Sequence, residues 1–151
     1  MGIFIEDLLN FGNLIDAELE VKLGPSELRR AYTELDFEIG EGVLRVIKKR
    51  KMFFLNRDLE LRLSEGGGVK KDRENLEHWA FFRVLSKGGL QEILKLPGFR
   101  AEGEHVGMEV MKAVSLTDTY QRIPKQFRER LIINRYKIGK DHLSVFFKFE
   151  K

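Results

Sequence analysis

Three charged residues near the start of the chain stand at a spacing that could do chemistry. Glu18, Glu20 and Lys22 alternate with apolar residues in the stretch AELEVKL. On a β-strand, residues two apart project from one face about 7 Å from each other. Two carboxylates at this spacing can share a divalent cation, and the ammonium beside them can hold a phosphate oxygen. The pattern predicts a strand whose polar face either binds such a ligand or is simply solvated.

More groups of the same kind occur later in the chain. Arg62 lies on the polar face of the alternating stretch DLELRL, Arg100, Glu102 and Glu104 form the stretch RAEGE, and Arg135 lies in the closing region. If the strands curl into a barrel, these polar faces line one interior. Such a cavity would suit a polyphosphate, because arginine forks hold phosphate oxygens and a carboxylate-bound metal neutralises the remaining charge.

The order of four stretches resembles a known family. ELEVKL, LELRLSEGG, RAEGE and NRYKIGKDHLSVFF follow one another like the landmarks of the CYTH, or triphosphate tunnel metalloenzyme, family. The resemblance implies an antiparallel tunnel barrel that binds triphosphate with Mg²⁺ or Mn²⁺, in a family that includes triphosphatases and adenylyl cyclases. The stretch VIKKRKMFFLNRDLELRLSEGGG also fits the late hairpin of that family, so the chain can be aligned with the family in two ways.

The resemblance also implies roles for individual residues. It implies carboxylate ligands for the metal, two of them in the first strand and one or both of a later pair assisting: Glu18, Glu20, Glu102 and Glu104. It implies basic side chains that contact phosphate: Lys22, Arg62, Arg100 and Arg135.

A second function is suggested by a basic run that leads into aromatic residues. The stretch RVIKKRKMFF contains five basic residues: Arg45, Lys48, Lys49, Arg50 and Lys51. A basic strand beside aromatic rings can bind a nucleic-acid backbone while bases stack on the rings. One alternative is that the lysines are solvated and at least one of the two phenylalanines belongs to the core. Others are that the region binds a protein, or that the chain is a structural or assembly subunit with no small-molecule site.

Composition limits the class of protein. The 151 residues fit one domain, residues 1–151, and 42% apolar with 34% charged residues indicate a globular chain. A net charge of +3 favours anionic partners only weakly. The absence of cysteine excludes disulfides, thiolate zinc sites and a cysteine nucleophile. Many charged residues without cysteine are also typical of heat-adapted proteins, so a thermophilic origin is a hypothesis that a melting temperature would test.

The apolar stretch IFIEDLLNFGNLI contains Glu6 and Asp7 and has no basic leader. We expect neither a signal peptide nor a membrane span there, and therefore a cytoplasmic protein. Its apolar residues recur at helical spacing, which predicts an amphipathic helix over residues 4–15.

The remaining periodicities predict both kinds of element. Helices are expected to begin at Pro25 and Pro124 and to lie over 89–96, where Pro97-Gly98 stops the helix. Alternation of apolar and polar residues predicts strands at 17–23, 58–64 and 105–116, while residues 75–85 fit a strand or a helix. Glycines predict a hairpin turn at residues 40–42 and a break at residues 66–68. The chain is expected to close with a hairpin that turns near residues 139–141. The fold class is therefore α+β, with a mainly antiparallel, curved sheet or barrel and helices packed against it.

Overall fold

The computed structural model describes residues 18–52, 55–69 and 79–149, and these form an α+β fold. The strands are β1 (Leu19–Leu23), β2 (Asp36–Gly40), β3 (Val43–Met52), β4 (Leu55–Val69), β5 (Trp79–Ser86), β6 (Phe99–Glu102), β7 (His105–Glu109), β8 (Leu131–Ile138) and β9 (Leu143–Phe149). The helices are short: α1 (Pro25–Ala31), α2 (Leu90–Leu94), α3 (Met111–Val114), α4 (Asp118–Gln121) and α5 (Lys125–Arg128). The helix expected over residues 4–15 lies outside the described residues.

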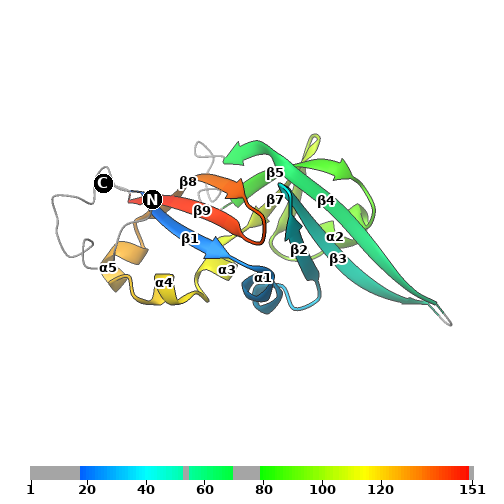
Figure 1. Cartoon of the computed structure of the whole chain (residues 1–151), viewed down its shortest axis with the longest axis horizontal. Coiled ribbons are helices and arrows are strands. Elements are labelled where there is room, and N and C mark those ends of the chain that lie inside the picture. Colours follow the sequence, from blue (N-terminus) through cyan, green and yellow to red (C-terminus); the bar gives the residue numbers. More distant parts are fainter. Residues whose placement is uncertain (1–17, 53–54, 70–78, 150–151) are drawn as a thin grey trace.

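The strands form two antiparallel sheets (Figure 1). One has three strands in the order β1-β9-β8, and the other has six in the order β2-β3-β4-β5-β7-β6. The expectation of an antiparallel α+β fold is thus confirmed. The sheets do not close into a barrel, because each ends in its own edge strands. The enclosed interior on which the polyphosphate cavity depended is therefore not formed by these strands.

Alternation of apolar and polar residues explains how the strands build one core. In β1, Leu19, Val21 and Leu23 are fully buried while Lys22 is exposed. Apolar side chains of both sheets and of α1, α2, α3 and α5 join a single buried cluster. Burial of this kind contributes roughly 25 cal/mol for each Å² of apolar surface removed from water, which makes it the main term that holds the sheets together.

Two polar contacts join the sheets where β8 approaches β4 and β5. The Tyr136 hydroxyl donates to the backbone carbonyl of Phe81 at 2.5 Å, and the Ile138 amide donates to Glu65 Oε1 at 2.5 Å. The second bond satisfies a backbone group on the outer edge of β8. An unpaired amide there would cost free energy if it were buried.

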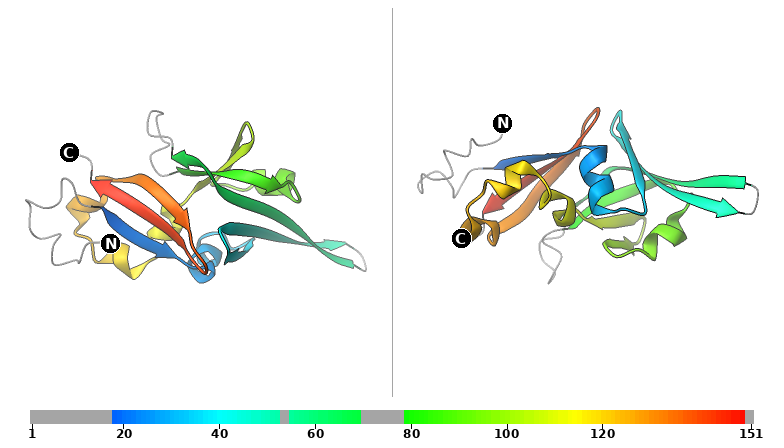
Figure 2. Two further views of the ribbon diagram at one scale, coloured as in Figure 1. Left: turned by 45° about the horizontal axis from the view of Figure 1, so that its top comes forward. Right: turned by 90° about the horizontal axis from the view of Figure 1, so that it is seen from below.

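Among the described elements, the hairpin of β3 and β4 is the most extended. Its ladder runs from the pair Val43–Ser64 to the pair Met52–Leu55. Figures 1 and 2 show its outer end projecting beyond all the other described elements. The five residues from Lys48 to Met52 alone span roughly 15 Å at the usual rise of a strand.

Most local expectations are confirmed. The predicted strand at 17–23 is β1, the helix at Pro25 is α1, the turn at residues 40–42 joins β2 to β3, and the closing hairpin is β8–β9. Two expectations are wrong. β4 continues through Gly66–Gly68 by means of a bulge, and the strand expected over 105–116 ends at Glu109, after which α3 begins. In the described part of the chain, no helix has the length and apolar character that a membrane crossing requires.

Candidate functional site

The sequence explains why the β3–β4 hairpin forms. A tight turn precedes it, in which Glu41 and Gly42 both have positive φ, as a two-residue hairpin turn requires. Beyond the turn, Leu44 and Val46 of β3 and Leu61 and Leu63 of β4 are completely buried. The alternating positions of both strands therefore belong to the outer, polar face of the six-stranded sheet.

Two arginines stand directly opposite each other on this outer face. Arg45 of β3 pairs with Arg62 of β4 in the ladder. Like charges at opposed positions destabilise a sheet unless they are compensated. Here Glu60 lies between them, with one carboxylate oxygen 3.3 Å from Arg45 Nε and the other 3.3 Å from Arg62 Nε, and Glu38 contacts Arg45 at 3.2 Å.

The outer end of the hairpin contains the rest of the basic run. Lys48 is partly exposed, and the structure describes the backbone but not the side chains of Lys49, Arg50 and Lys51. Arg50 stands opposite Arg57 in the ladder, a second pair of like charges at opposed positions. Alternate positions of a strand belong to opposite faces, so basic residues occur on both faces of this ribbon.

A hollow of about 600 Å³ lies at the base of the hairpin, on the same outer face. β2, β3, β4 and β5 all contribute to its lining: Glu38, Ile39, Gly40, Glu41, Val43, Arg45, Arg62, Leu85 and Ser86. It combines two guanidinium groups, two carboxylates, a hydroxyl and three large apolar side chains. A volume of this size falls within the range of pockets that hold small molecules.

The first predicted site lies on the other sheet. Glu18 accepts hydrogen bonds from Arg135 Nη2 at 2.9 Å, from Arg135 Nε at 3.2 Å and from Asn134 at 2.5 Å. The hydrogen bonds from Arg135, more than any other cause, hold the pKa of the Glu18 carboxyl below its usual value. Glu20 and Lys22 share this outer face of β1, opposite Phe146 and Ser144 of β9.

Arg135 contacts an aromatic ring as well as the carboxylate of Glu18. The Arg135 guanidinium lies 3.8 Å from the centroid of the Phe146 ring, whose residue is nearly buried. A guanidinium plane on an aromatic face gains a cation–π attraction. The cluster of Glu18, Arg135 and Phe146 is therefore a structural contact in which predicted metal and phosphate ligands bind each other.

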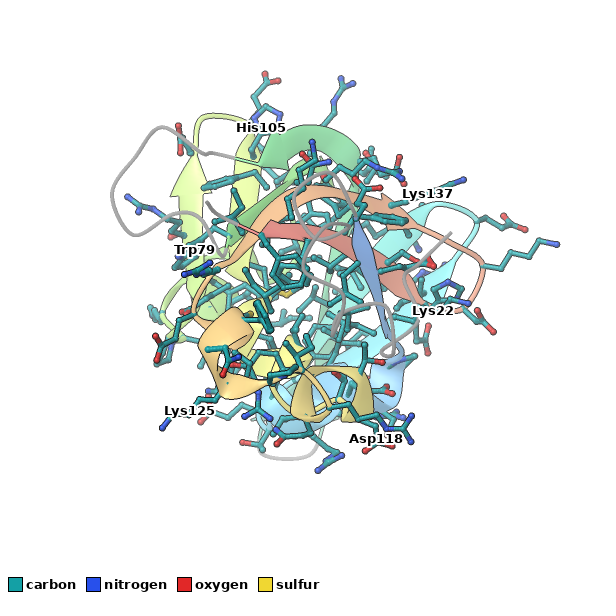
Figure 3. All side chains as sticks on the ribbon, turned by 90° about the vertical axis from the view of Figure 1, so that its left-hand side faces the viewer. Lys22, Trp79, His105, Asp118, Lys125 and Lys137 are labelled. Atoms are coloured by element: carbon teal, nitrogen blue, oxygen red, sulfur yellow. The ribbon has the colours of Figure 1, made fainter. Side chains whose placement is uncertain are left out.

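The remaining predicted ligands lie at the opposite edge of the larger sheet. Arg100 and Glu102 belong to β6, Glu104 lies in the turn that follows, and the Arg100 guanidinium lies 5.9 Å from the centroid of the Trp79 ring. Figure 3 shows Lys22 on one side of the molecule and Trp79 on the other. The structure thus brings Glu18 and Arg135 together, and does not gather them with Arg62, Arg100 or Glu102.

The carboxylates predicted to bind a metal are likewise not gathered at one place in the fold. Over residues 18–52, 55–69 and 79–149, no three His, Asp or Glu side chains come close enough together to hold a metal ion. Of the four carboxylates expected to bind Mg²⁺ or Mn²⁺, Glu18 directly precedes β1 and Glu20 lies in it, whereas Glu102 and Glu104 lie in the β6–β7 region of the other sheet.

The sequence patterns placed Arg45 and Arg62 in different predicted sites and gave no site role to Glu60 or Leu85. The opposition of the two arginines follows from the register of the hairpin, in which Met52 pairs with Leu55. A two-residue connection between Met52 and Leu55 would have predicted it, but the two residues between them, Phe53 and Phe54, are not of the types that favour a tight turn. Leu85 enters the hollow only because of a bulge in β5.

Comparison with known proteins found no matching family model, no matching curated protein and no matching solved structure.

Proposed function

We propose that this chain is a nucleic-acid-binding module whose main contact is the β3–β4 hairpin. The supporting observation is the distribution of charge. Residues 43–64 contain seven lysines and arginines against two carboxylates, a net charge of +5. Because the whole chain has a net charge of +3, all its other residues together amount to −2.

The shape of the hairpin fits this partner. A projecting two-stranded ribbon has the dimensions that the major groove of B-form DNA admits. Basic residues occur at positions of both faces of the ribbon, as described above, so phosphates of both strands can be neutralised when the ribbon lies in a groove. Contacts of this kind release counterions and provide affinity that does not depend on sequence.

The arginine pairs support the proposal in a second way. Arg45 with Arg62 and Arg50 with Arg57 place like charges at opposed positions of one ladder. Like charges at opposed positions need compensation, which Glu60 and Glu38 provide for the first pair in the free protein. A phosphate backbone beside the hairpin would provide further compensation, since guanidinium groups donate to phosphate oxygens. The proposal retains a phosphate-bearing ligand and replaces the enclosed triphosphate with the exposed backbone of a nucleic acid.

The test is a titration of a fluorescent blunt DNA duplex of about 20 base pairs, the length of roughly two turns of helix. Binding is measured by anisotropy at several salt concentrations. We expect the affinity of the wild type to fall linearly with the logarithm of salt concentration. The double variant Lys48→Glu with Arg50→Glu should bind much more weakly and should lower the slope of that plot by about 2 if each residue contacts one phosphate.

The matched control is a double variant with the same change of charge at two residues outside the hairpin. Arg122 directly follows α4 and Lys125 is the first residue of α5, and both are exposed and lie outside the hairpin. The variant Arg122→Glu with Lys125→Glu should keep both the affinity and the slope of the wild type. Equal losses in the two variants would mean that only net charge matters. A wild type that does not bind duplex DNA, duplex RNA or single strands at low salt would contradict the proposal.

A further inference from the structure

A bulge in β5 turns an apolar side chain toward the outer face of the larger sheet. Arg62 pairs with Ser86 and Leu63 pairs with Val84, so Leu85 has no partner on β4. The side chain of Leu85 is 53% exposed and lines the hollow at the base of the hairpin. Bulges of this kind re-aim side chains and are common beside binding sites.

The lining of the hollow does not fit an isolated phosphate. The guanidinium groups of Arg45 and Arg62 are matched in charge by the carboxylates of Glu38 and Glu41, and Glu38 already contacts Arg45. These four side chains have no net charge, so the hollow by itself does not select an isolated anion. The ligand that fits such a lining has a flat, weakly polar part and several hydrogen-bonding groups around it.

The base and sugar of an unpaired nucleotide have this chemistry. Bases stack on guanidinium planes and on apolar side chains, and their amino groups, like sugar hydroxyls, donate to carboxylates. Leu85, together with Ile39 and Val43, provides the apolar surface, and Ser86 adds a hydroxyl. The hollow of about 600 Å³ is large enough for a ligand of this size.

The hollow is continuous with the proposed nucleic-acid contact. Arg45 and Arg62 belong to both, since they line the hollow and lie in the ladder of the hairpin. A strand whose phosphates follow the hairpin would bring its end to the hollow. We propose that the hollow is a subsite for an unpaired nucleotide at the end of a bound duplex, an inference that rests on the proposed function.

The experiment compares two probes that differ only in their ends. One is the blunt duplex used above, and the other is the same duplex with a single-stranded extension of about four nucleotides, enough to cover one such site. We expect the wild type to bind the extended duplex about tenfold more tightly, as stacking of one base on a protein surface would give. The variant Leu85→Ser should bind both probes equally and should keep the wild-type affinity for the blunt duplex.

The chain provides a matched control for this substitution. Leu116, between α3 and α4, is also a large exposed apolar residue and is 37% exposed. Leu116→Ser should keep the preference for the extended duplex. A second variant, Ser86→Glu, adds a carboxylate on the other side of the bulge and should remove the preference, as Leu85→Ser does. Unfolding of each variant in urea checks that the fold is retained.

The outcomes separate the two proposals. Equal binding of the two probes by the wild type overturns the nucleotide subsite and leaves the hairpin contact intact. A preference that survives in both Leu85→Ser and Ser86→Glu also overturns the subsite. Absence of binding to either probe overturns both proposals.

Discussion

Glu18 and Arg135 are 117 residues apart in the sequence, and two hydrogen bonds, at 2.9 and 3.2 Å, join their side chains across the outer face of the three-stranded sheet. The contact crosses β9, the strand between β1 and β8. The sequence predicted that Glu18 and Arg135 would bind a ligand, whereas in the structure they bind each other. The contact instead helps to fix the order of the three strands.

Removal of the carboxylate should therefore affect stability. Glu18→Gln keeps the shape of the side chain and removes its charge. Because the contact is partly exposed, we expect the free energy of unfolding to fall by no more than about 1 kcal/mol. Glu20→Gln is the matched control, since Glu20 is on the same face and forms no salt bridge with a described residue. Urea unfolding of both variants at neutral pH measures the difference, and an equal loss in both would contradict the assignment.

The same contact predicts a dependence on pH. Since the hydrogen bonds from Arg135 lower the pKa of Glu18 in the folded protein, its contribution to stability is complete above the ordinary value of 4.5. The contribution is lost as the pH falls through the lowered pKa, where Glu18 becomes protonated. The difference in unfolding free energy between the wild type and Glu18→Gln should thus be constant near neutral pH and shrink in acid. A difference that grows as the pH falls would give the wrong sign and refute the explanation.

A close approach of backbone and ring gives a third prediction. Gly107 of β7 stands opposite Phe81 of β5, and a Cβ at position 107 would lie 2.6 Å from Cε1 of that ring. Both residues are buried. We expect Gly107→Ala to lower the free energy of unfolding by about 1–3 kcal/mol, as overpacking of a core does.

The control for this substitution is Gly40→Ala. Gly40 is also in a strand, and the nearest atom to its added Cβ is a backbone oxygen at 3.7 Å, an ordinary contact. Alanine should be tolerated there, since it removes the conformational entropy cost of glycine. Denaturant unfolding of the two variants is the measurement. Equal stability of both would show that the Phe81 ring moves aside without cost.

Local periodicity was sufficient to predict much of the fold. The alternation in AELEVKL gives β1, and Pro25 with Glu27 gives the start of α1, where Glu27 accepts a hydrogen bond from the amide of Gly24. The turn at residues 40–42 was evident because Gly42 supplies one of the two positive φ values. These features depend on neighbours in the sequence, so the sequence alone reveals them.

Features set by distant parts of the chain were not predicted. Gly66–Gly68 look like a break, but β5 pairs with Gly68 and Val69 and keeps them in β4. The prediction of a barrel was wrong for a related reason. Closure of a sheet depends on how its edge strands pair and not on the pattern within each strand. The hollow was missed because the bulge that exposes Leu85 arises from pairing between β4 and β5.

The shared carboxylate at the hairpin gives the last prediction. Glu60 contacts both Arg45 and Arg62 at 3.3 Å, and it separates two like charges at opposed positions. Glu60→Gln removes this compensation, so we expect a loss of up to about 1 kcal/mol in the free energy of unfolding. The freed guanidinium groups should at the same time bind phosphate better. We expect affinity for the blunt DNA duplex to rise about two- to tenfold at low salt, with a steeper salt dependence.

A loss of stability together with a gain of affinity in Glu60→Gln would identify Arg45 and Arg62 as phosphate contacts. Glu34→Gln removes the same charge from an exposed position in the loop between α1 and β2, and it should leave both quantities nearly unchanged. If both variants gain affinity equally, the effect comes from net charge. If Glu60→Gln loses stability and gains no affinity, Arg45 and Arg62 do not contact the nucleic acid, and the contact is confined to the outer end of the hairpin.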